Sequence, residues 1–541
     1  MKGECLVKEI QMKNFRSLKD TEMQPLSPIT ILVGENSSGK STFLRAFPLL
    51  KQSISKRTSG PILWAGDVDD YVDFGSFEET VTNDGSDDIT FGFKFSIDPR
   101  EILSRHYSYS ISNVKKIVDL SNVDVHYDMK ITSERGRDRV TEVTLGIGSF
   151  RVVFDIGKNT LTTNGGLKYC VPSVKHLDKD VEQEGREYFD YFRRHCSAFG
   201  FELPVIDELW RGTVDEIIRS SSRSESLFII EASIIIGAVL FNNNNLADLS
   251  IERKNDTSIA KLMSDYFSNL SKLLEGDQSG KTADVFRLCF LYDCFMLIDD
   301  YIYTYFKHVH YIAPLRATAE RYYRLRNLAV DEVDYQGKNL PIFINSLTDE
   351  QLKQFQIWTD KHFGFTIDID KSRGHLSLLI QLRGSDKKIN LSDTGFGYSQ
   401  VLPIITQMWE LAALPKDSYS KDSYTHFYSV NRLLPLVIAI EQPELHLHPA
   451  IQAKLAKAFI ACIDIARKNK RELQLIIETH SETIVNYFGR AIARKQLDPN
   501  DVSVIIFEKN VGDSVTEVQN SYYNKYGMLT NWPYGFFESE E

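Results

Sequence analysis

Residues 29–42 read ITILVGENSSGKST, an apolar run followed by a loop that fits the pattern GxxxxGK[ST] over Gly34–Ser41. The apolar run predicts a strand that is buried on both of its faces. The residues after Lys40 have helical spacing, although Pro48 should end or kink that helix early. A buried strand, a glycine loop and a helix in this order are the context of a phosphate-binding loop, so the stretch predicts a nucleotide site in an α/β fold.

The residue types in this loop suit the binding of a triphosphate and Mg2+. Gly34 and Gly39 allow backbone N–H groups to point inward around the phosphates, where the start of the helix adds its positive dipole end. Lys40 is expected to reach the β and γ phosphates, and Ser41 to offer its hydroxyl to Mg2+. A chance match in a glycine-containing turn is the alternative, which the flanking strand and helix make the weaker one.

Two later apolar runs end in polar residues. PLVIAI (435–440) is followed by Glu441 and Gln442, and LQLIIE (473–478) is followed by Thr479 and His480. A carboxylate at a strand tip beside a phosphate loop is where Mg2+ is held, so Glu441 is the predicted residue on the metal side. His480 can form a hydrogen bond with a γ-phosphate oxygen. Alone, these patterns also fit an ordinary strand end and a surface histidine.

Residues 393–400 (DTGFGYSQ) form a glycine-spaced loop that opens a predicted helix, and a helix N-terminus is a second potential anion site. Because the chain has one phosphate loop, this second site suggests a γ-phosphate delivered from a partner copy. A simple helix cap is the alternative. His446 and His448 could bind a metal from one face of an extended segment, but packing around Pro449 is favoured.

The pattern of strand-like and helix-like segments predicts that the chain has three regions. Residues 1–165 hold the phosphate loop and an antiparallel β region from Asp88 to about Thr163, and residues 309–541 hold the later strands and helices. Residues 166–308 look like an inserted helical domain. This insertion carries 16 Lys and Arg against 23 Asp and Glu, so it is acidic.

Composition excludes several classes of protein. The net charge is -11, so the surface as a whole repels polyanions and any nucleic-acid contact needs a local basic groove. Six cysteines without a CxxC pair are expected to be reduced thiols of a cytosolic protein. The charged N-terminal stretch reads as a strand, not a signal peptide, and the run Leu227–Phe241 falls short of the roughly 20 residues that cross a bilayer. A cytoplasmic protein without a membrane segment is expected.

Four motifs together resemble the ABC-type ATPases grouped with the overcoming-lysogenization-defect proteins and the SMC/Rad50 heads. They are GENSSGKST (34–42), GFGYSQ (395–400), IEQPELHLHP (440–449) and ETHSE (478–482). The segments YVDFGSFEE (71–79), YIAPLRA (311–317) and NWPYGFF (531–537) resemble a narrower branch, the PtuA-type ATPase subunits of Septu and retron-associated anti-phage systems. The resemblance covers residues 1–100 and 309–541.

The resemblance implies an ABC-type head of mixed and parallel sheet with helices, plus an antiparallel β subdomain, interrupted by the helical insertion. It implies ATP and Mg2+ as cofactors and two copies that meet head to head around ATP. It makes Glu441 the Walker B carboxylate and His480 the switch histidine. The other implied nucleotide contacts are Asn14, Arg16, Asn36, Ser37, Ser38, Thr42, Gly395, Gly397, Ser399 and Gln400. Gln52 occurs where relatives have a glutamine after the first helix, and its contact with Mg2+ stays open.

Gln442 stands where relatives of this class usually carry the glutamate that polarises the attacking water. An amide can hold a water but cannot take its proton, so slow hydrolysis is expected. Glu444 is the alternative base. The signature at 395–400 also departs from the LSGGQ form of transporters, which leaves the γ-phosphate donor open between Ser399 and backbone amides.

Three functions compete. The first is an ATP-gated defence subunit that controls a partner HNH nuclease, with a reverse transcriptase and its nucleic-acid product as a further partner. The second is a DNA-end or repair clamp of the SMC/Rad50 type, against which stand the acidic insertion and the absence of a long heptad arm. The third is a self-contained nuclease of the overcoming-lysogenization-defect type, which requires a cluster of acidic metal ligands that the sequence does not display.

Overall fold

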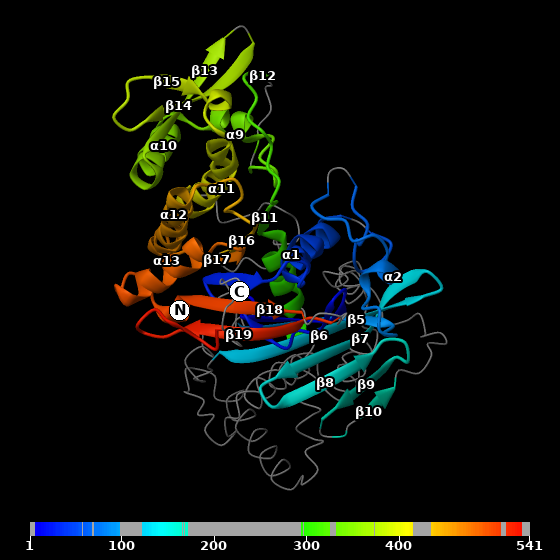
Figure 1. The fold of residues 1–541 in the computed structure, drawn as a ribbon. Coiled ribbons are helices and arrows are strands. Elements are labelled where there is room, and N and C mark those ends of the chain that lie inside the picture. The colour runs from blue at the N-terminus through cyan, green and yellow to red at the C-terminus, as the bar shows by residue number, and fades with distance from the viewer. Residues whose placement is uncertain are drawn as a thin grey trace, which may run out of the picture.

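The computed structural model describes residues 6–56, 58–67, 70–97, 122–164, 166, 168–170, 294–295, 297–324, 330, 332–372, 374–414, 434–509 and 515–532. These residues form three sheets with helices packed between and beside them (Figure 1). Most of the predicted helical insertion, including the run Leu227–Phe241, lies outside the described residues. The chain has the α/β fold that the sequence predicts.

The central sheet contains the phosphate-loop strand. Its order is β11-β16-β17-β4-β18-β19-β20, parallel from β11 to β18 and antiparallel over the last two strands. The three predicted apolar strands are all in its parallel part, as expected for strands that are covered on both faces. The bounds are β4 (Ile29–Gly34), β11 (Val309–Ile312), β16 (Leu436–Glu441), β17 (Leu473–Glu478), β18 (Val502–Glu508), β19 (Glu517–Tyr523) and β20 (Leu529–Thr530).

The second sheet is antiparallel and has the order β10-β9-β8-β7-β6-β5-β1-β2, with β3 paired to β1. It confirms the β region predicted from Asp88 to Thr163. The sheet also passes the predicted boundary at residue 166, because β10 pairs with β9 in register. The bounds are β1 (Glu9–Phe15), β2 (Leu18–Asp20), β3 (Gln24–Pro25), β5 (Asp88–Ile97), β6 (Val123–Glu134), β7 (Arg137–Ile147), β8 (Phe150–Asp155), β9 (Thr160–Thr163) and β10 (Lys168–Cys170).

Helices cover both faces of the central sheet. The strand β16 shows this by alternation: Val437 and Ala439 belong to the core shared with α1 (Lys40–Ser55), while Ile438 and Ile440 belong to the core on the opposite face. That opposite core contains α11 (Phe396–Ala413), α12 (Pro449–Lys468) and α13 (Glu482–Ala493). The helical residues 297–307, which the sequence assigns to the insertion, pack instead into the first core beside the antiparallel sheet.

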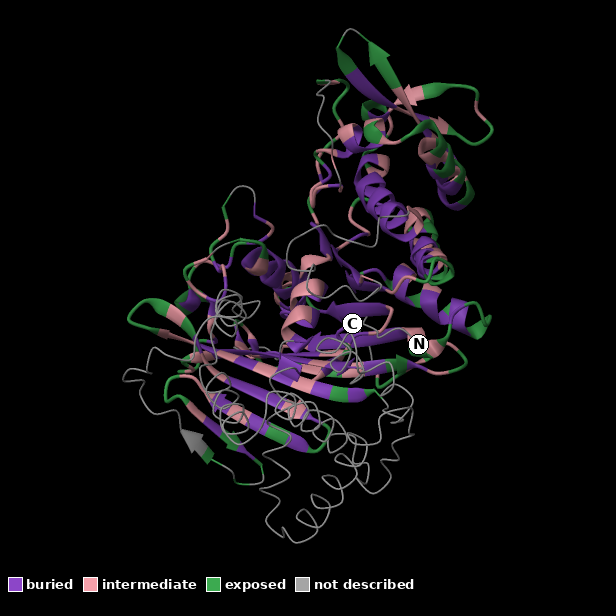
Figure 2. Ribbon diagram, turned by 180° about the vertical axis from the view of Figure 1, so that it is seen from behind, coloured by how far each residue is buried: buried purple, intermediate pink, exposed green. Residues whose placement is uncertain are grey.

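A third sheet lies at the far end of α11 and α12 (Figure 1). It contains β12 (Tyr323–Arg324), β13 (Phe365–Ser372), β14 (His375–Leu382) and β15 (Lys388–Asn390). The helices α9 (Leu340–Ser346) and α10 (Asp349–Phe363) pack beside it, and the short helix α2 (Phe77–Thr80) lies in the other half of the chain. Figure 2 shows many exposed residues on this sheet, in contrast to the buried strands of the central sheet.

Of the two outcomes predicted for Pro48, an early end of the helix is wrong, because α1 continues through it to Ser55. A proline inside a helix removes one hydrogen bond and costs about 3 kcal/mol. Phe47, Leu49 and Leu50, which flank Pro48, are fully buried, and each such side chain contributes roughly 1.5–3 kcal/mol on burial. Packing of this face therefore outweighs the local penalty.

Within the ranges that the structure describes, no helix combines the length and the apolar character that crossing a membrane requires.

Candidate functional site

The predicted phosphate loop, Glu441 and His480 lie at the carboxyl ends of the parallel strands β4, β16 and β17, where α1 begins (Figure 1). Parallel strands end on the same side of a sheet, and this edge of an α/β sheet is where ligands commonly bind. The order of the strands decides which strand ends lie beside the phosphate loop. Because β17 lies between β16 and β4, its last residue is nearer to the phosphate loop than the last residue of β16.

The phosphate loop is close-packed around its glycines. Gly39 precedes α1 with φ 97°, a left-handed conformation that favours glycine. A Cβ atom at Gly39 would lie 2.9 Å from both Leu18 Cδ2 and Ser17 Oγ, and one at Gly34 would lie 2.3 Å from the Phe507 carbonyl oxygen. The hairpin that contains Leu18 therefore supports the loop from below, and substitution of either glycine would disrupt it.

Lys40 is 3% exposed and points back into its own loop. Its ammonium donates to the carbonyl oxygens of Gly34, at 3.0 Å, and of Glu35. Burial lowers the pKa of Lys40, and the nearby carboxylate of Glu478 acts in the opposite direction. A buried ammonium held by neutral carbonyl oxygens can gain much from an anion at this loop, as its predicted role requires.

The other predicted loop residues divide between surface and interior. Asn36 and Ser37 are exposed, Ser41 and Thr42 are half-buried, and Ser38 is buried. Within the described residues, Ser38 Oγ has no hydrogen-bond partner. The loop thus offers both solvent-facing and enclosed polar groups around the start of α1, which fits a phosphate group.

Ser41 contacts a carboxylate that the sequence analysis did not single out. Its hydroxyl donates to Glu478 Oε1 at 2.8 Å, across the junction between α1 and the end of β17. Glu478 is 1% exposed, and its Oε2 atom has no hydrogen-bond partner among the described residues. Burial, together with the charge of Glu441, raises the pKa of Glu478 to about 7. The signal that could have found it is the acidic residue that ends the apolar run LQLIIE.

Glu441, the predicted metal-side residue, is also 1% exposed but is fully engaged. Arg45 donates from Nε to Oε1 at 2.6 Å and from Nη2 to Oε2 at 2.8 Å. The hydroxyl of Tyr311 donates to Oε1 at 2.7 Å. This bidentate pair neutralises the charge of Glu441 within the protein.

Gln442 and Glu444 follow Glu441 at the same edge. Gln442 has φ 41°, and its amide Nε2 makes a long contact of 3.5 Å with Glu478 Oε1. Glu444 accepts from the Thr479 hydroxyl at 2.8 Å and from the backbone N–H of His480 at 2.6 Å, so it joins the ends of β16 and β17. Burial raises the pKa of Glu444.

The side chain of His480 is exposed at the end of β17. Partial desolvation, with the charge of Lys40, lowers the pKa of His480, so its imidazole is neutral at pH 7 and can either donate or accept a hydrogen bond. This agrees with the predicted place of a histidine beside the phosphate loop.

The predicted signature lies at the start of α11 and is less exposed than its role suggests. Ser399 and Gln400 are buried: Ser399 Oγ donates to the Phe396 carbonyl at 2.7 Å, and Gln400 Nε2 contacts the Arg316 carbonyl at 3.4 Å. Gly395 is exposed, and Phe396 is 50% exposed at the helix tip. The groups available to a partner are therefore the helix start and Phe396.

The sequence points to the motif YIAPLRA but not to Arg316 itself. It is buried, and its Nη2 donates to the carbonyl oxygen of Glu441 at 2.9 Å. Gln400 Nε2 contacts the carbonyl oxygen of Arg316, so Arg316 connects the start of α11 with the end of β16.

The first hairpin contributes Asn14 and Arg16, both with positive φ. Arg16 is exposed, and its guanidinium lies 4.6 Å from the centre of the Phe74 ring. Arg16 Nη2 donates to the Phe74 carbonyl oxygen at 3.3 Å, and partial burial with the charge of Arg45 lowers the pKa of Arg16. Gln52 is different: it is inside α1, and its amide is used by the backbone of Leu63 and Val72.

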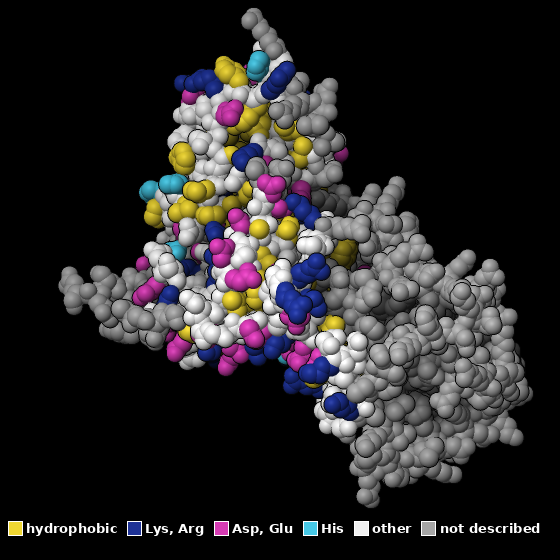
Figure 3. Space-filling view, turned by 90° about the vertical axis from the view of Figure 1, so that its right-hand side faces the viewer, with side chains coloured by type: hydrophobic (Ala, Val, Ile, Leu, Met, Phe, Trp, Pro, Cys, Tyr) yellow, Lys and Arg dark blue, Asp and Glu magenta, His cyan; other side chains and the backbone are white. Residues whose placement is uncertain are grey.

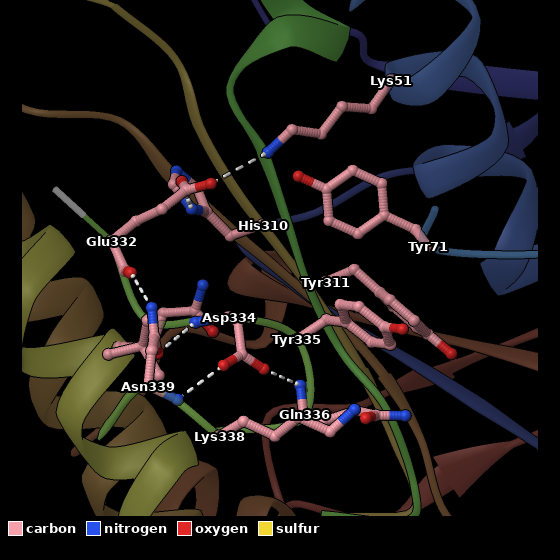
Figure 4. A pocket seen from close by; sticks show the side chains of 12 residues that line it. Lys51, Tyr71, His310, Tyr311, Glu332, Asp334, Tyr335, Gln336, Lys338 and Asn339 are labelled. Atoms are coloured by element: carbon pink, nitrogen blue, oxygen red, sulfur yellow. Dashed lines mark hydrogen bonds and ion pairs between the residues drawn. The ribbon is translucent and has the colours of Figure 1, made fainter. Parts of the chain in front are cut away.

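A pocket of about 330 Å³ lies behind Tyr311 (Figure 4). Tyr311 stacks on Tyr335 at 6.1 Å between ring centres, and Tyr335 in turn meets Tyr71 edge-on. Lys51 and Glu332 form a long ion pair of 3.9 Å across the pocket. This aromatic layer fixes the ring of Tyr311, and it therefore also fixes the hydroxyl that donates a hydrogen bond to Glu441.

His446 and His448 do not form a metal centre within the described residues, where no group of three or more potential ligands is found. His448 Nδ1 accepts from the Ala450 N–H at 3.2 Å and caps α12, and His446 lies edge-on to the ring of Phe396. These contacts agree with the favoured packing interpretation.

Comparison with known proteins yields a family model that matches most of the chain and two local similarities to curated proteins. A family model described as an AAA ATPase domain matches residues 6–485. The OLD nuclease of Thermus scotoductus is 49% identical over 45 residues, 8% of this chain and 8% of that protein. The DNA replication and repair protein RecF of Nitrosococcus oceani is 44% identical over 52 residues, 10% of this chain and 14% of that protein.

The chain thus spans only a small part of the length of these curated relatives. Among solved structures, an SMC head domain from Thermotoga maritima aligns over 95% of this chain and 98% of its own, with 10% identity and a TM-score of 0.31.

Proposed function

The chain belongs to the AAA ATPase domain family, and from this premise we propose that it binds ATP with Mg2+ between two facing copies and hydrolyses the ATP slowly. In this proposal the bound state of the pair controls a partner nuclease in anti-phage defence. The observation that carries the ATP site is the convergence of Lys40, Ser41 and Glu478 on one glycine loop at the carboxyl edge of a parallel sheet.

The residues of this edge fit ATP and Mg2+. The backbone N–H groups of the loop and the start of α1 bind the phosphates, and Lys40 leaves its two carbonyl partners for the β and γ phosphates. When bound, Mg2+ neutralises charge on the phosphate oxygens. Ser41 offers it a hydroxyl. Ser38 Oγ and Glu478 Oε2 are buried atoms without a hydrogen-bond partner in the described part of the chain, and a ligand would satisfy them.

Replacement of Lys40 by alanine tests the ATP site. We expect calorimetry to detect no ATP binding at concentrations that saturate the wild type, because the main positive side chain of the loop is gone. Lys56→Ala is the matched control, since Lys56 follows the end of the same helix and pairs with Asp70. Unchanged affinity of the Lys40→Ala protein would remove the assignment.

Slow hydrolysis follows from Gln442 at the place of the usual glutamate. General-base help worth roughly 10²- to 10⁴-fold is missing when an amide replaces a carboxylate. Binding survives, so the ATP-bound pair is long-lived and acts as a latch. We expect Gln442→Glu to raise turnover. If the wild type already turns over at ordinary ABC rates and Glu444→Gln stops it, then Glu444 is the base and the latch idea is wrong.

The pairing of two copies is supported by the exposed start of α11. Gly395 and Phe396 present backbone N–H groups and an apolar ring to solvent, where a second copy with its ATP can cover them. Addition of ATP and Mg2+ should shift the protein from monomer to dimer in analytical ultracentrifugation. Phe396→Ala should weaken this shift without loss of ATP binding to the monomer.

The defence role rests on the resemblance to the ATPase subunits of Septu and retron-associated systems. By this resemblance the effector is an HNH nuclease and, in the retron case, a further partner is a reverse transcriptase with its nucleic-acid product. Co-purification of an HNH protein encoded beside this chain, dependent on ATP and lost in Lys40→Ala, is the expected result.

A second candidate is a DNA-repair clamp, which the local match to RecF favours. On the face shown in Figure 3, Lys and Arg side chains alternate with Asp and Glu. A clamp needs phosphate contacts, and each such contact steepens the fall of affinity with salt. ATP-dependent binding to duplex DNA with a steep salt dependence would favour the clamp over the nuclease-controlling role.

A further inference from the structure

The edge of the central sheet carries two buried glutamates on neighbouring strands. Glu441 ends β16, Glu478 ends β17, and the two residues are direct partners in the parallel register. Each is 1% exposed. The two carboxylates differ in what surrounds them, and that difference bears on where a cation can bind.

Both carboxylate oxygens of Glu441 already accept hydrogen bonds. Arg45 contacts both of its oxygens, at 2.6 and 2.8 Å, and Tyr311 adds a third hydrogen bond at 2.7 Å. To coordinate Mg2+, this carboxylate would give up bonds to a guanidinium that already neutralises it. Such charge-assisted bidentate bonds are among the strongest that proteins form.

Glu478 has the opposite arrangement. Its Oε1 atom accepts from Ser41 at 2.8 Å, the hydroxyl that the phosphate loop offers to Mg2+. Its Oε2 atom is buried without a hydrogen-bond partner in the described part of the chain. A buried carboxylate with an oxygen that no hydrogen bond satisfies is costly, and a bound cation relieves that cost.

The strand order explains the difference. Since β17 intervenes between β16 and β4, the side chain at its end is the one adjacent to the start of α1. Arg45, one helical turn after Ser41, reaches over to Glu441 on the further strand. Ser41 and Arg45 on one face of α1 therefore each contact one of the two glutamates.

We propose that Glu478, in place of Glu441, is the protein carboxylate of the Mg2+ site, acting beside Ser41. Glu441 instead fixes Arg45 and the end of β16. This assignment rests on the proposed function, because the cation arrives with ATP. Mg2+ commonly takes one or two carboxylates together with phosphate oxygens and water, which is the donor set available at this junction.

Calorimetric titration of ATP, with Mg2+ and with EDTA, separates the two carboxylates. In the wild type we expect Mg2+ to tighten ATP binding. In Glu478→Gln, the increase in ATP affinity that Mg2+ provides should be about 10- to 100-fold smaller, the range found when groups that support a metal are removed. Its ATP affinity in EDTA should equal that of the wild type. Glu441→Gln is the matched control, and it should keep the gain from Mg2+.

A second readout uses Mn2+ in place of Mg2+ and does not depend on turnover. Electron paramagnetic resonance should detect protein-bound Mn2+ in the presence of ATP for the wild type and Glu441→Gln, and much less for Glu478→Gln. Glu478→Asp keeps a carboxylate and should retain part of the bound signal, which provides the test if the glutamine variant does not fold.

The outcomes distinguish this inference from the proposed function. A wild type that binds no ATP in either condition overturns the ATP site itself. A wild type that binds ATP normally, with the Mg2+ gain lost in Glu441→Gln and kept in Glu478→Gln, overturns only the assignment of Glu478.

Discussion

The amino and carboxyl ends of the parallel strands in the central sheet hold buried polar side chains in opposite ways. At the amino edge, Gln474 at the start of β17 is neutral and satisfied: its Nε2 donates to the carbonyl oxygens of Val7 and Leu26, and its Oε1 accepts from Tyr305. At the carboxyl end of the same strand, Glu478 is an acid with one oxygen that has no hydrogen-bond partner among the described residues. One strand thus carries a structural amide at one end and an incomplete site at the other.

This difference indicates which end of the parallel strands binds a ligand. A satisfied neutral network contributes to stability and needs nothing more, whereas a buried carboxyl group without a partner costs free energy unless a ligand completes it. Variants at the amino edge should therefore change stability alone. At the carboxyl end, variants of the Arg45–Glu441–Tyr311 group should change mainly stability, whereas variants of Glu478 should change the binding of ATP with Mg2+.

The largest effect is expected for Arg45→Met. It leaves Glu441 buried without its cation, and breaking a buried ion pair costs about 3–5 kcal/mol of unfolding free energy. Urea unfolding at pH 7 measures this loss. The double variant Arg45→Met with Glu441→Gln should recover much of it, because no uncompensated charge remains. A single variant as stable as the wild type would show that the pair contributes nothing.

Tyr311→Phe is expected to rank second. It removes a hydrogen bond to a charged carboxylate, an interaction worth roughly 1.5–3 kcal/mol. The ring and its stack on Tyr335 remain, so the loss in urea unfolding reports the hydroxyl alone. Because Glu441 keeps Arg45, the variant should retain ATP binding when measured by calorimetry. A loss of ATP affinity as large as that of Lys40→Ala would contradict this division of roles.

At the amino end of the parallel strands, His308 should make the free energy of unfolding depend on pH. His308 precedes β11, and burial lowers the pKa of His308 to about 4, although its Nδ1 bond to the Thr304 carbonyl acts in the other direction. The unfolded chain then binds a proton more readily than the folded one. Stability is therefore full above the ordinary histidine pKa near 6.5 and falls as the pH drops toward 4.

At about pH 5 the loss from His308 should be about 2 kcal/mol relative to pH 7. Urea unfolding of the wild type and of His308→Gln at both pH values isolates it, since the variant lacks the titrating group. Equal pH dependence of the two proteins would assign the acid sensitivity to other groups.

The sequence predicts the strands β4, β16 and β17 of the central sheet and the antiparallel β region, because their apolar runs and alternation are local features, but it does not single out β18, β19 and β20. It also locates the phosphate loop, whose glycines and lysine are contiguous. It does not predict Glu478, since the order of parallel strands is not the order of the chain, and only the insertion of β17 between β16 and β4 brings Glu478 to Ser41. The partners of Glu441 are likewise far apart in sequence, at Arg45 and Tyr311.

The smallest effect is expected for Tyr305→Phe, the counterpart of Tyr311→Phe at the amino edge. Tyr305 donates to the neutral Oε1 of Gln474 at 2.8 Å, so the lost bond should cost about 0.5–1.5 kcal/mol. Both tyrosines lose only a buried hydroxyl, which makes the pair a matched test of what their acceptors contribute. Urea unfolding should therefore find Tyr311→Phe the less stable variant. If Tyr305→Phe costs as much as Tyr311→Phe, then the charge of Glu441 adds nothing to its hydrogen bond, and the contrast between the two edges does not extend to stability.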